Sequence, residues 1–145
     1  MARAKNHESE IKIILDLRQH YTFEPSFGAY LFEGKERKDH SCSSIRITAQ
    51  LLMCDSKKIK DIDTVELNLE CEAESKTGFF GSVNKQKEIL DGYVYLNQHD
   101  FIYVYQLITN KQVEAIVLTC AEFHYGAASV TALYIEPTYD QKDWL

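Results

Sequence analysis

A glutamate, a histidine and a tyrosine near the C-terminal end have the types and spacing that acid–base chemistry requires. Glu122 and His124 share one face if this segment is a strand, and Tyr125 follows them. A carboxylate beside an imidazole can hold it in one tautomer, so these residues could form a small-ligand or catalytic pocket between a helix and a sheet. The commoner interpretation is a surface ion pair near a turn.

Metal chemistry has one candidate, the pair His40 and Cys42. The next thiol, Cys54, lies at the far end of the following segment, on the order of 30 Å away if that segment is extended. Cys71 and Cys120 belong to apolar faces and are expected to be small buried hydrophobic residues. We therefore predict no metal site.

Recognised catalytic and cofactor motifs are missing from the sequence. It contains no nucleophile elbow, phosphate-binding loop, dinucleotide fingerprint, paired-histidine zinc motif or calcium loop. We therefore expect no cofactor and lean against an enzyme, although an unfamiliar active site stays open.

A row of carboxylates is the main candidate for a binding surface. Residues 65–74 alternate between apolar and polar types, so a strand would carry its charges on one face, about 7 Å apart. Such a row favours association with a basic partner. The alternative is an ordinary solvated face whose carboxylates are neutralised by Arg46 or by lysines on the adjoining strand. The predicted face consists of Glu66, Asn68, Glu70, Glu72 and Glu74.

Aromatic residues are the second candidate for a binding surface. Phe79 and Phe80 stand between two glycines in a polar stretch, which predicts a turn with two aromatic rings at its tip. Such rings either tuck under the sheet or meet a partner. The nine tyrosines suit a binding surface or self-association, but packing at the core with their hydroxyl groups in water explains them equally well.

Most of the chain has the two-residue period of half-buried strands. The clearest strands are residues 11–17, 45–53 and 65–73, and the last two should form an antiparallel hairpin. Residues 33–44 read as a loop. Shorter strands are expected at 27–31, 93–96 and 127–135, and a longer one at 113–123.

One segment changes to a helical period. Phe101, Val104, Tyr105 and Ile108 are spaced as one face of a helix, with Asn97 as its N-cap, which predicts a helix over residues 98–110. A strand over 101–105 is the alternative. Few charges interrupt residues 113–123, so this strand should be central and covered on both faces, with the helix as one cover.

These elements predict one domain spanning residues 1–145, of the α+β class: a mostly antiparallel β-sheet or β-sandwich with one covering helix. Residues 1–60 carry a charge of +3 and residues 61–145 a charge of −9, so the net charge is −6. This balance argues against binding to nucleic acid or to an anionic membrane surface. The N-terminal residues show no apolar leader and the four cysteines no CxxC pair, so we expect a cytoplasmic protein with reduced thiols.

The function that the sequence favours is a non-catalytic protein-interaction domain, for example an inhibitor or neutralising partner of a basic protein, acting through the acidic strand face. A homo-oligomeric assembly protein is one alternative. A small-ligand binder or enzyme with the Glu122 and His124 pocket is the other.

Overall fold

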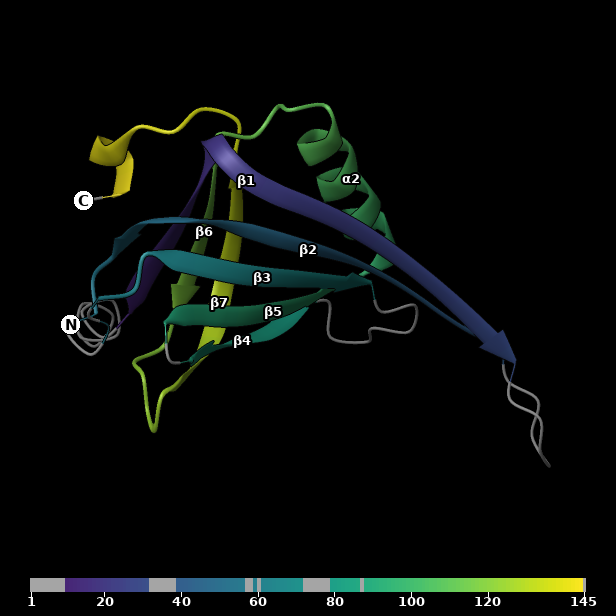
Figure 1. Cartoon of the computed structure of the whole chain (residues 1–145), viewed down its shortest axis with the longest axis horizontal. Coiled ribbons are helices and arrows are strands. Elements are labelled where there is room, and N and C mark those ends of the chain that lie inside the picture. Colours follow the sequence, from purple (N-terminus) through teal and green to yellow (C-terminus); the bar gives the residue numbers. More distant parts are fainter. Residues whose placement is uncertain are drawn as a thin grey trace, which may run out of the picture.

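A computed structural model describes residues 10–31, 39–56, 59, 61–71, 79–86 and 88–144. Within these residues, seven strands close into a barrel in the order β1-β2-β3-β5-β4-β7-β6 (Figure 1). The strands are β1 (Ile11–Leu31), β2 (Asp39–Cys54), β3 (Thr64–Cys71), β4 (Phe79–Lys85), β5 (Ile89–Leu96), β6 (Ala115–Cys120) and β7 (Ala127–Glu136). The helix α2 (Gln98–Thr109) lies between β5 and β6 in the sequence, and a short 3-10 helix, η1 (Gln141–Trp144), follows β7.

The prediction of an open sheet or a sandwich is wrong, because the sheet closes on itself. The first and sixth strands pair over Ile11–Asp16 and Ala115–Cys120, and β4 joins β7 through Ser82, Val83 and Asn84. Alternation shows which residues face inward, but the inside of a barrel and the inner face of a sandwich have the same two-residue period. The predicted antiparallel character is confirmed, since β3 with β5 is the one parallel pair in the described part of the chain.

Aliphatic side chains fill the inside of the barrel. The predicted hairpin of β2 and β3 is present, with Ile45 paired to Leu69 and Ile47 to Leu67, and all four side chains are fully buried. Val65, Leu67 and Leu69 of β3 are buried, as the alternation predicted, and every second residue of β5, which is longer than the expected strand at 93–96, is buried as well.

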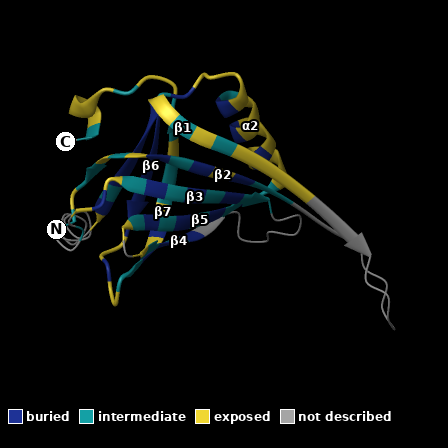
Figure 2. Ribbon diagram, viewed as in Figure 1, coloured by how far each residue is buried: buried dark blue, intermediate teal, exposed yellow. Residues whose placement is uncertain are grey.

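The first two strands form a long ribbon that continues past the pairing of β1 with β6, and β3 lies along the other side of β2 as far as Ser43. Asp16 pairs with Gln50 and Tyr21 pairs with Ala49. Because Gln50 and Ala49 are consecutive, residues 17–20 of β1 have no partner on β2 and form a bulge. After this bulge the pairing runs as far as Leu31 with Asp39. A single strand thus replaces the two separate ones expected at 11–17 and 27–31. The exposed outer part of β1 contrasts with the buried β6 (Figure 2).

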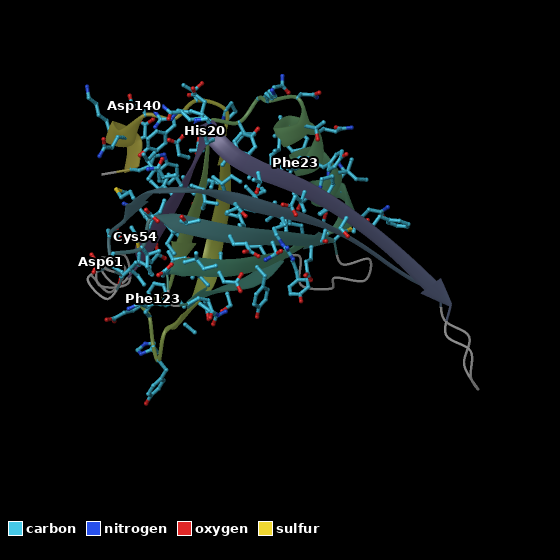
Figure 3. The ribbon with its side chains drawn as sticks, in the orientation of Figure 1. His20, Phe23, Cys54, Asp61, Phe123 and Asp140 are labelled. Atoms are coloured by element: carbon cyan, nitrogen blue, oxygen red, sulfur yellow. The ribbon has the colours of Figure 1, made fainter. Side chains whose placement is uncertain are left out.

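The predicted helix is present and packs against the ribbon. Asn97 is its N-cap, since its side chain accepts a hydrogen bond from the Asp100 N–H. Phe101, Val104 and Ile108 are buried, and the Tyr105 ring lies 5.8 Å from that of Phe23 on β1 (centroid to centroid). Figure 3 shows Phe23 beside α2 and away from Phe123. No helix in the described ranges is long and apolar enough to cross a membrane.

The sixth strand is buried on both faces, as predicted, but the helix is not the outer cover. All six residues of β6 are buried. Ile116, Leu118 and Cys120 belong to the barrel core, whereas Ala115 and Val117 pack outside the barrel with Ile14. The C-terminal segment covers this outer cluster with the side chains of Tyr139 and Trp144.

Two expected loops are in part strands. The backbone of Phe79 and Phe80 lies in β4, paired with Leu96 and Tyr95, so these residues do not form a turn. The predicted loop at residues 33–44 overlaps β2, which begins at Asp39. In both places the neighbouring strand supplies hydrogen bonds that the local sequence does not reveal.

Candidate functional site

The predicted acidic face lies on the outside of the barrel. On β3, Glu66, Asn68 and Glu70 are partly exposed and alternate with the buried Val65, Leu67 and Leu69. The expected outward direction of Glu66 and Glu70 therefore agrees with the structure. Glu72 and Glu74 lie outside the described residues.

The neighbouring strand β5 adds residues that the sequence analysis did not assign to this face. The parallel pairing places Asp91 beside Glu66, Tyr93 beside Asn68 and Tyr95 beside Glu70. The two tyrosine rings meet edge to face with centroids 5.5 Å apart. We call the outward side chains of β3 and β5 the acidic tyrosine face; it consists of Glu66, Asn68, Glu70, Asp91, Tyr93 and Tyr95.

One arginine partly neutralises this face. The Arg46 Nε on β2 lies 3.3 Å from Glu66 Oε1 and donates a 3.4 Å hydrogen bond to Asn68 Oδ1. The expected neutralisation of a carboxylate by Arg46 is therefore found at Glu66. Within the described residues, neither Glu70 nor Asp91 has a basic side chain at ion-pair distance. The carboxylates of Glu70 and Asp91 therefore remain for a cationic ligand.

The predicted aromatic pair is adjacent to this face in the backbone. Phe80 pairs with Tyr95 across β4 and β5, and Ser82 pairs with Tyr93. The side chains of Phe79 and Phe80 lie outside the described part of the structure. The pairing alone places their strand next to the acidic tyrosine face.

The Glu122, His124 and Tyr125 group lies at the tip of the hairpin between β6 and β7. All three side chains are exposed, while Phe123 between them is buried. His124 and Ala127 exchange two backbone hydrogen bonds, of 2.8 and 3.0 Å, and Tyr125 has a φ of 55°. These residues therefore form a tight turn that points its side chains into solvent.

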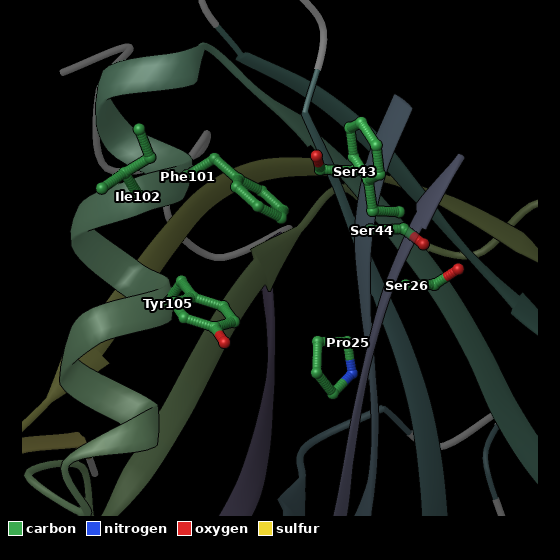
Figure 4. A pocket seen from close by; sticks show the side chains of 8 residues that line it. Pro25, Ser26, Ser43, Ser44, Phe101, Ile102 and Tyr105 are labelled. Carbon is green, nitrogen blue, oxygen red and sulfur yellow. The ribbon is translucent and has the colours of Figure 1, made fainter. Parts of the chain in front are cut away.

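Hollows between the helix and the sheet exist, but other residues line them. One, of about 320 Å³, lies between α2 and the β1–β2 ribbon, where Phe101 and Tyr105 face Pro25 and Phe27 (Figure 4). A second, of about 370 Å³, lies on the other side of α2, between the helix and β7. Neither is lined by Glu122, His124 or Tyr125.

A polar cluster at the β1 bulge was missed by the sequence analysis. Asp16 is buried and its carboxylate accepts hydrogen bonds from the Arg18 backbone N–H and Nε, both at 2.9 Å. The hydrogen bond from the Arg18 side chain lowers the pKa of Asp16 below its ordinary value, against the opposing effect of burial. The Arg18 guanidinium lies 5.3 Å from the centre of the Tyr139 ring, and the Tyr139 N–H donates to Glu114 Oε1 at 2.8 Å. This cluster fastens the C-terminal segment to the barrel.

The thiols of Cys54, Cys71 and Cys120 give no sign of a reactive site. Burial raises the pKa of Cys120 to about 12, and it also raises the pKa of Cys54 and Cys71. Nucleophilic cysteines need the opposite shift, because the thiolate is the reactive form. Among the described residues, no group of three histidine, cysteine or acidic side chains is placed to hold a metal ion.

No family model, curated protein or solved structure matches this chain.

Proposed function

We propose that this chain is a non-catalytic protein-interaction domain that binds a basic protein through the acidic tyrosine face. The observation that carries the proposal is the parallel pairing of β3 with β5, which brings Glu70 beside Tyr95 and Glu66 beside Asp91. Residues expected on separate strands thus share one outward surface.

The chemistry of this face suits lysine and arginine side chains. Glu70 and Asp91 lie four positions apart along the paired strands, roughly 13 Å, so two cationic side chains of a partner can each meet a carboxylate that has no basic partner in the described structure. Tyrosines are enriched in protein interfaces because they combine a large apolar area with a polar tip. The negative field of residues 61–145 would speed the approach of a basic protein.

The rigidity of the face also supports binding. Its side chains project from strands whose other side is the barrel core, so their backbone positions change little when a partner docks. The edge-to-face contact of Tyr93 and Tyr95 restrains both rings before binding. Less conformational entropy is then lost on association.

A charge-reversal experiment tests the proposal. We would immobilise the wild type, the Glu70→Lys/Asp91→Lys variant and a control with the same change in net charge, Glu10→Lys/Asp143→Lys, whose exposed side chains lie outside this face. Proteins captured from the native host would be identified by mass spectrometry, and their affinity measured by calorimetry at two salt concentrations. We expect a basic partner whose affinity falls at least tenfold with the first variant, is kept by the control and weakens with salt. Equal affinity for both variants would contradict the proposal.

A further inference from the structure

The seventh strand has a free edge along most of its length. β4 and β7 pair only through Ser82–Asn84 and Ala127–Ser129. On its other side, β7 stays paired with β6 as far as Glu136. In the part of the chain that the structure describes, the edge of β7 that faces away from β6 therefore has no strand partner beyond Ser129. Such an edge presents backbone N–H and C=O groups that can pair with another chain.

The second hollow beside α2 runs along this edge. Leu133 and Ile135 of β7 and Val104 of the helix contribute apolar walls to a hollow of about 370 Å³. Val104 is buried, while Leu133 and Ile135 are only partly buried although both pack against the barrel core. An apolar side chain entering here would complete their burial.

Among the described lining residues of the hollow, Asp100 is the one carboxylate. Asp100 lines it, and its side chain is 57% exposed. Its Oδ2 accepts a 3.0 Å hydrogen bond from Asn97 Nδ2, and the His99 Nδ1 lies 3.6 Å from Oδ1. Among the residues that the structure describes, no lysine or arginine lines the hollow. A cationic side chain therefore complements it, and an acidic one is repelled.

We propose that the free edge of β7 binds an extended segment of a partner protein as an additional strand. The segment's backbone pairs with β7 beyond Ser129, an apolar side chain fills the hollow against Val104 and Leu133, and a lysine or arginine lies beside Asp100. This is the strand-addition mode of peptide recognition, in which the backbone supplies affinity and the side-chain pockets supply specificity. The surface is separate from the acidic tyrosine face, so the two proposals can fail independently.

Synthetic peptides test this proposal on the unaltered protein. The probe is the acetylated and amidated hexapeptide Thr-Val-Thr-Lys-Thr-Val, whose valines and lysine share one face of an extended strand. It is compared with a version in which glutamate replaces lysine and with a version N-methylated at alternate backbone nitrogens. Binding is followed by amide chemical shifts in two-dimensional NMR. We expect the lysine peptide to shift the amides of residues 130–136 and those around Asp100. N-methylation should weaken binding about tenfold or more, because the strand hydrogen bonds are lost. The glutamate peptide should also bind more weakly.

One protein variant completes the test. Asp100→Asn keeps the helix cap, because Asn97 accepts the backbone N–H of residue 100, and it should weaken binding of the lysine peptide by about two- to fivefold. Asp143→Asn, an exposed carboxylate on η1, is the matched control and should leave the affinity unchanged. The proposal is overturned if the lysine peptide leaves residues 130–136 unshifted at millimolar concentration. Equal binding of the N-methylated or the glutamate peptide would overturn it as well.

Discussion

Tyr134 and Trp144 pack against each other with ring centroids 5.3 Å apart, which joins the C-terminal segment to the outside of β7. The same segment is held at the other side of the cluster by Lys12, whose Nζ donates a 2.9 Å hydrogen bond to the Trp144 carbonyl oxygen. Between these contacts lie Ile14 and Val117, which are fully buried although they point out of the barrel. The last residues of the described chain are therefore part of the hydrophobic structure.

Replacing Trp144 by alanine should destabilise the protein. The change uncovers the outer cluster around Ile14 and Val117, and we expect a loss of about 2 kcal/mol, below the range for a fully buried tryptophan because Trp144 is only partly buried. Urea unfolding followed by circular dichroism measures the loss. The control is Tyr125→Ala, at a fully exposed ring, which should change stability by less than about 0.5 kcal/mol. Equal effects of the two changes would show that the C-terminal segment contributes nothing.

Stability should depend on the ionisation of Asp16. The hydrogen bond from Arg18 lowers the pKa of Asp16 in the folded protein below the ordinary 3.8. The folded state thus keeps the carboxylate at pH values where the unfolded chain takes up a proton. The contribution of Asp16 to the free energy of unfolding is complete above pH 3.8. It is lost as the pH falls through the lower pKa of the folded state.

The variant that tests this linkage is Asp16→Asn. It should cost about 1 to 2 kcal/mol at pH 7, because the Arg18 hydrogen bonds lose their charged acceptor, and much less at pH 2. Urea midpoints of the variant and the wild type, measured across this range, give the difference directly. Glu10→Gln, at an exposed position, is the control and should show no such convergence. A constant difference between wild type and Asp16→Asn at every pH would refute the assignment.

Gly81 should tolerate a side chain less well than Gly92. A Cβ atom at this position would overlap the carbonyl oxygen of Tyr93, which belongs to the backbone of the paired strand β5 and cannot move aside cheaply. We expect Gly81→Ala to cost about 1 to 3 kcal/mol in urea unfolding. At Gly92 the nearest atoms are side-chain methyl groups of Val83 and Leu67, at 3.3 and 3.4 Å, so Gly92→Ala should cost less. The reverse order would mean that β4 and β5 are spaced differently.

The sequence was informative wherever a strand or helix keeps one face in the core. The alternation at residues 65–71 placed Glu66 and Glu70 outside the barrel, and the helical spacing of Phe101, Val104 and Ile108 identified the buried side of α2. The absence of charge in the middle of β6 correctly indicated burial on both faces. Each of these signals is local, because a single element determines which of its residues meet the core.

The arrangement of the elements was beyond such signals. Glu70 and Tyr95 are neighbours because β3 pairs in parallel with β5, although β4 lies between these strands in the sequence. No local pattern indicates which strands become neighbours. The glycines around Phe79 and Phe80 suggested a turn, whereas Gly81 is required by close contact between two strands. The C-terminal cover was missed because Tyr139 and Trp144 stand alone in a polar stretch without periodicity.

The pairing of Ile11 with Cys120 joins residues more than a hundred positions apart, and it has a kinetic consequence. This contact cannot form until Cys120 has been synthesised. The entropy cost of closing so long a loop is therefore offset by favourable contacts only late in folding. Proteins dominated by such distant contacts fold in milliseconds to seconds, roughly a thousandfold more slowly than helical bundles. Until then, the apolar inner row of β1 faces water beside an unpaired edge, which favours aggregation of the incompletely folded chain.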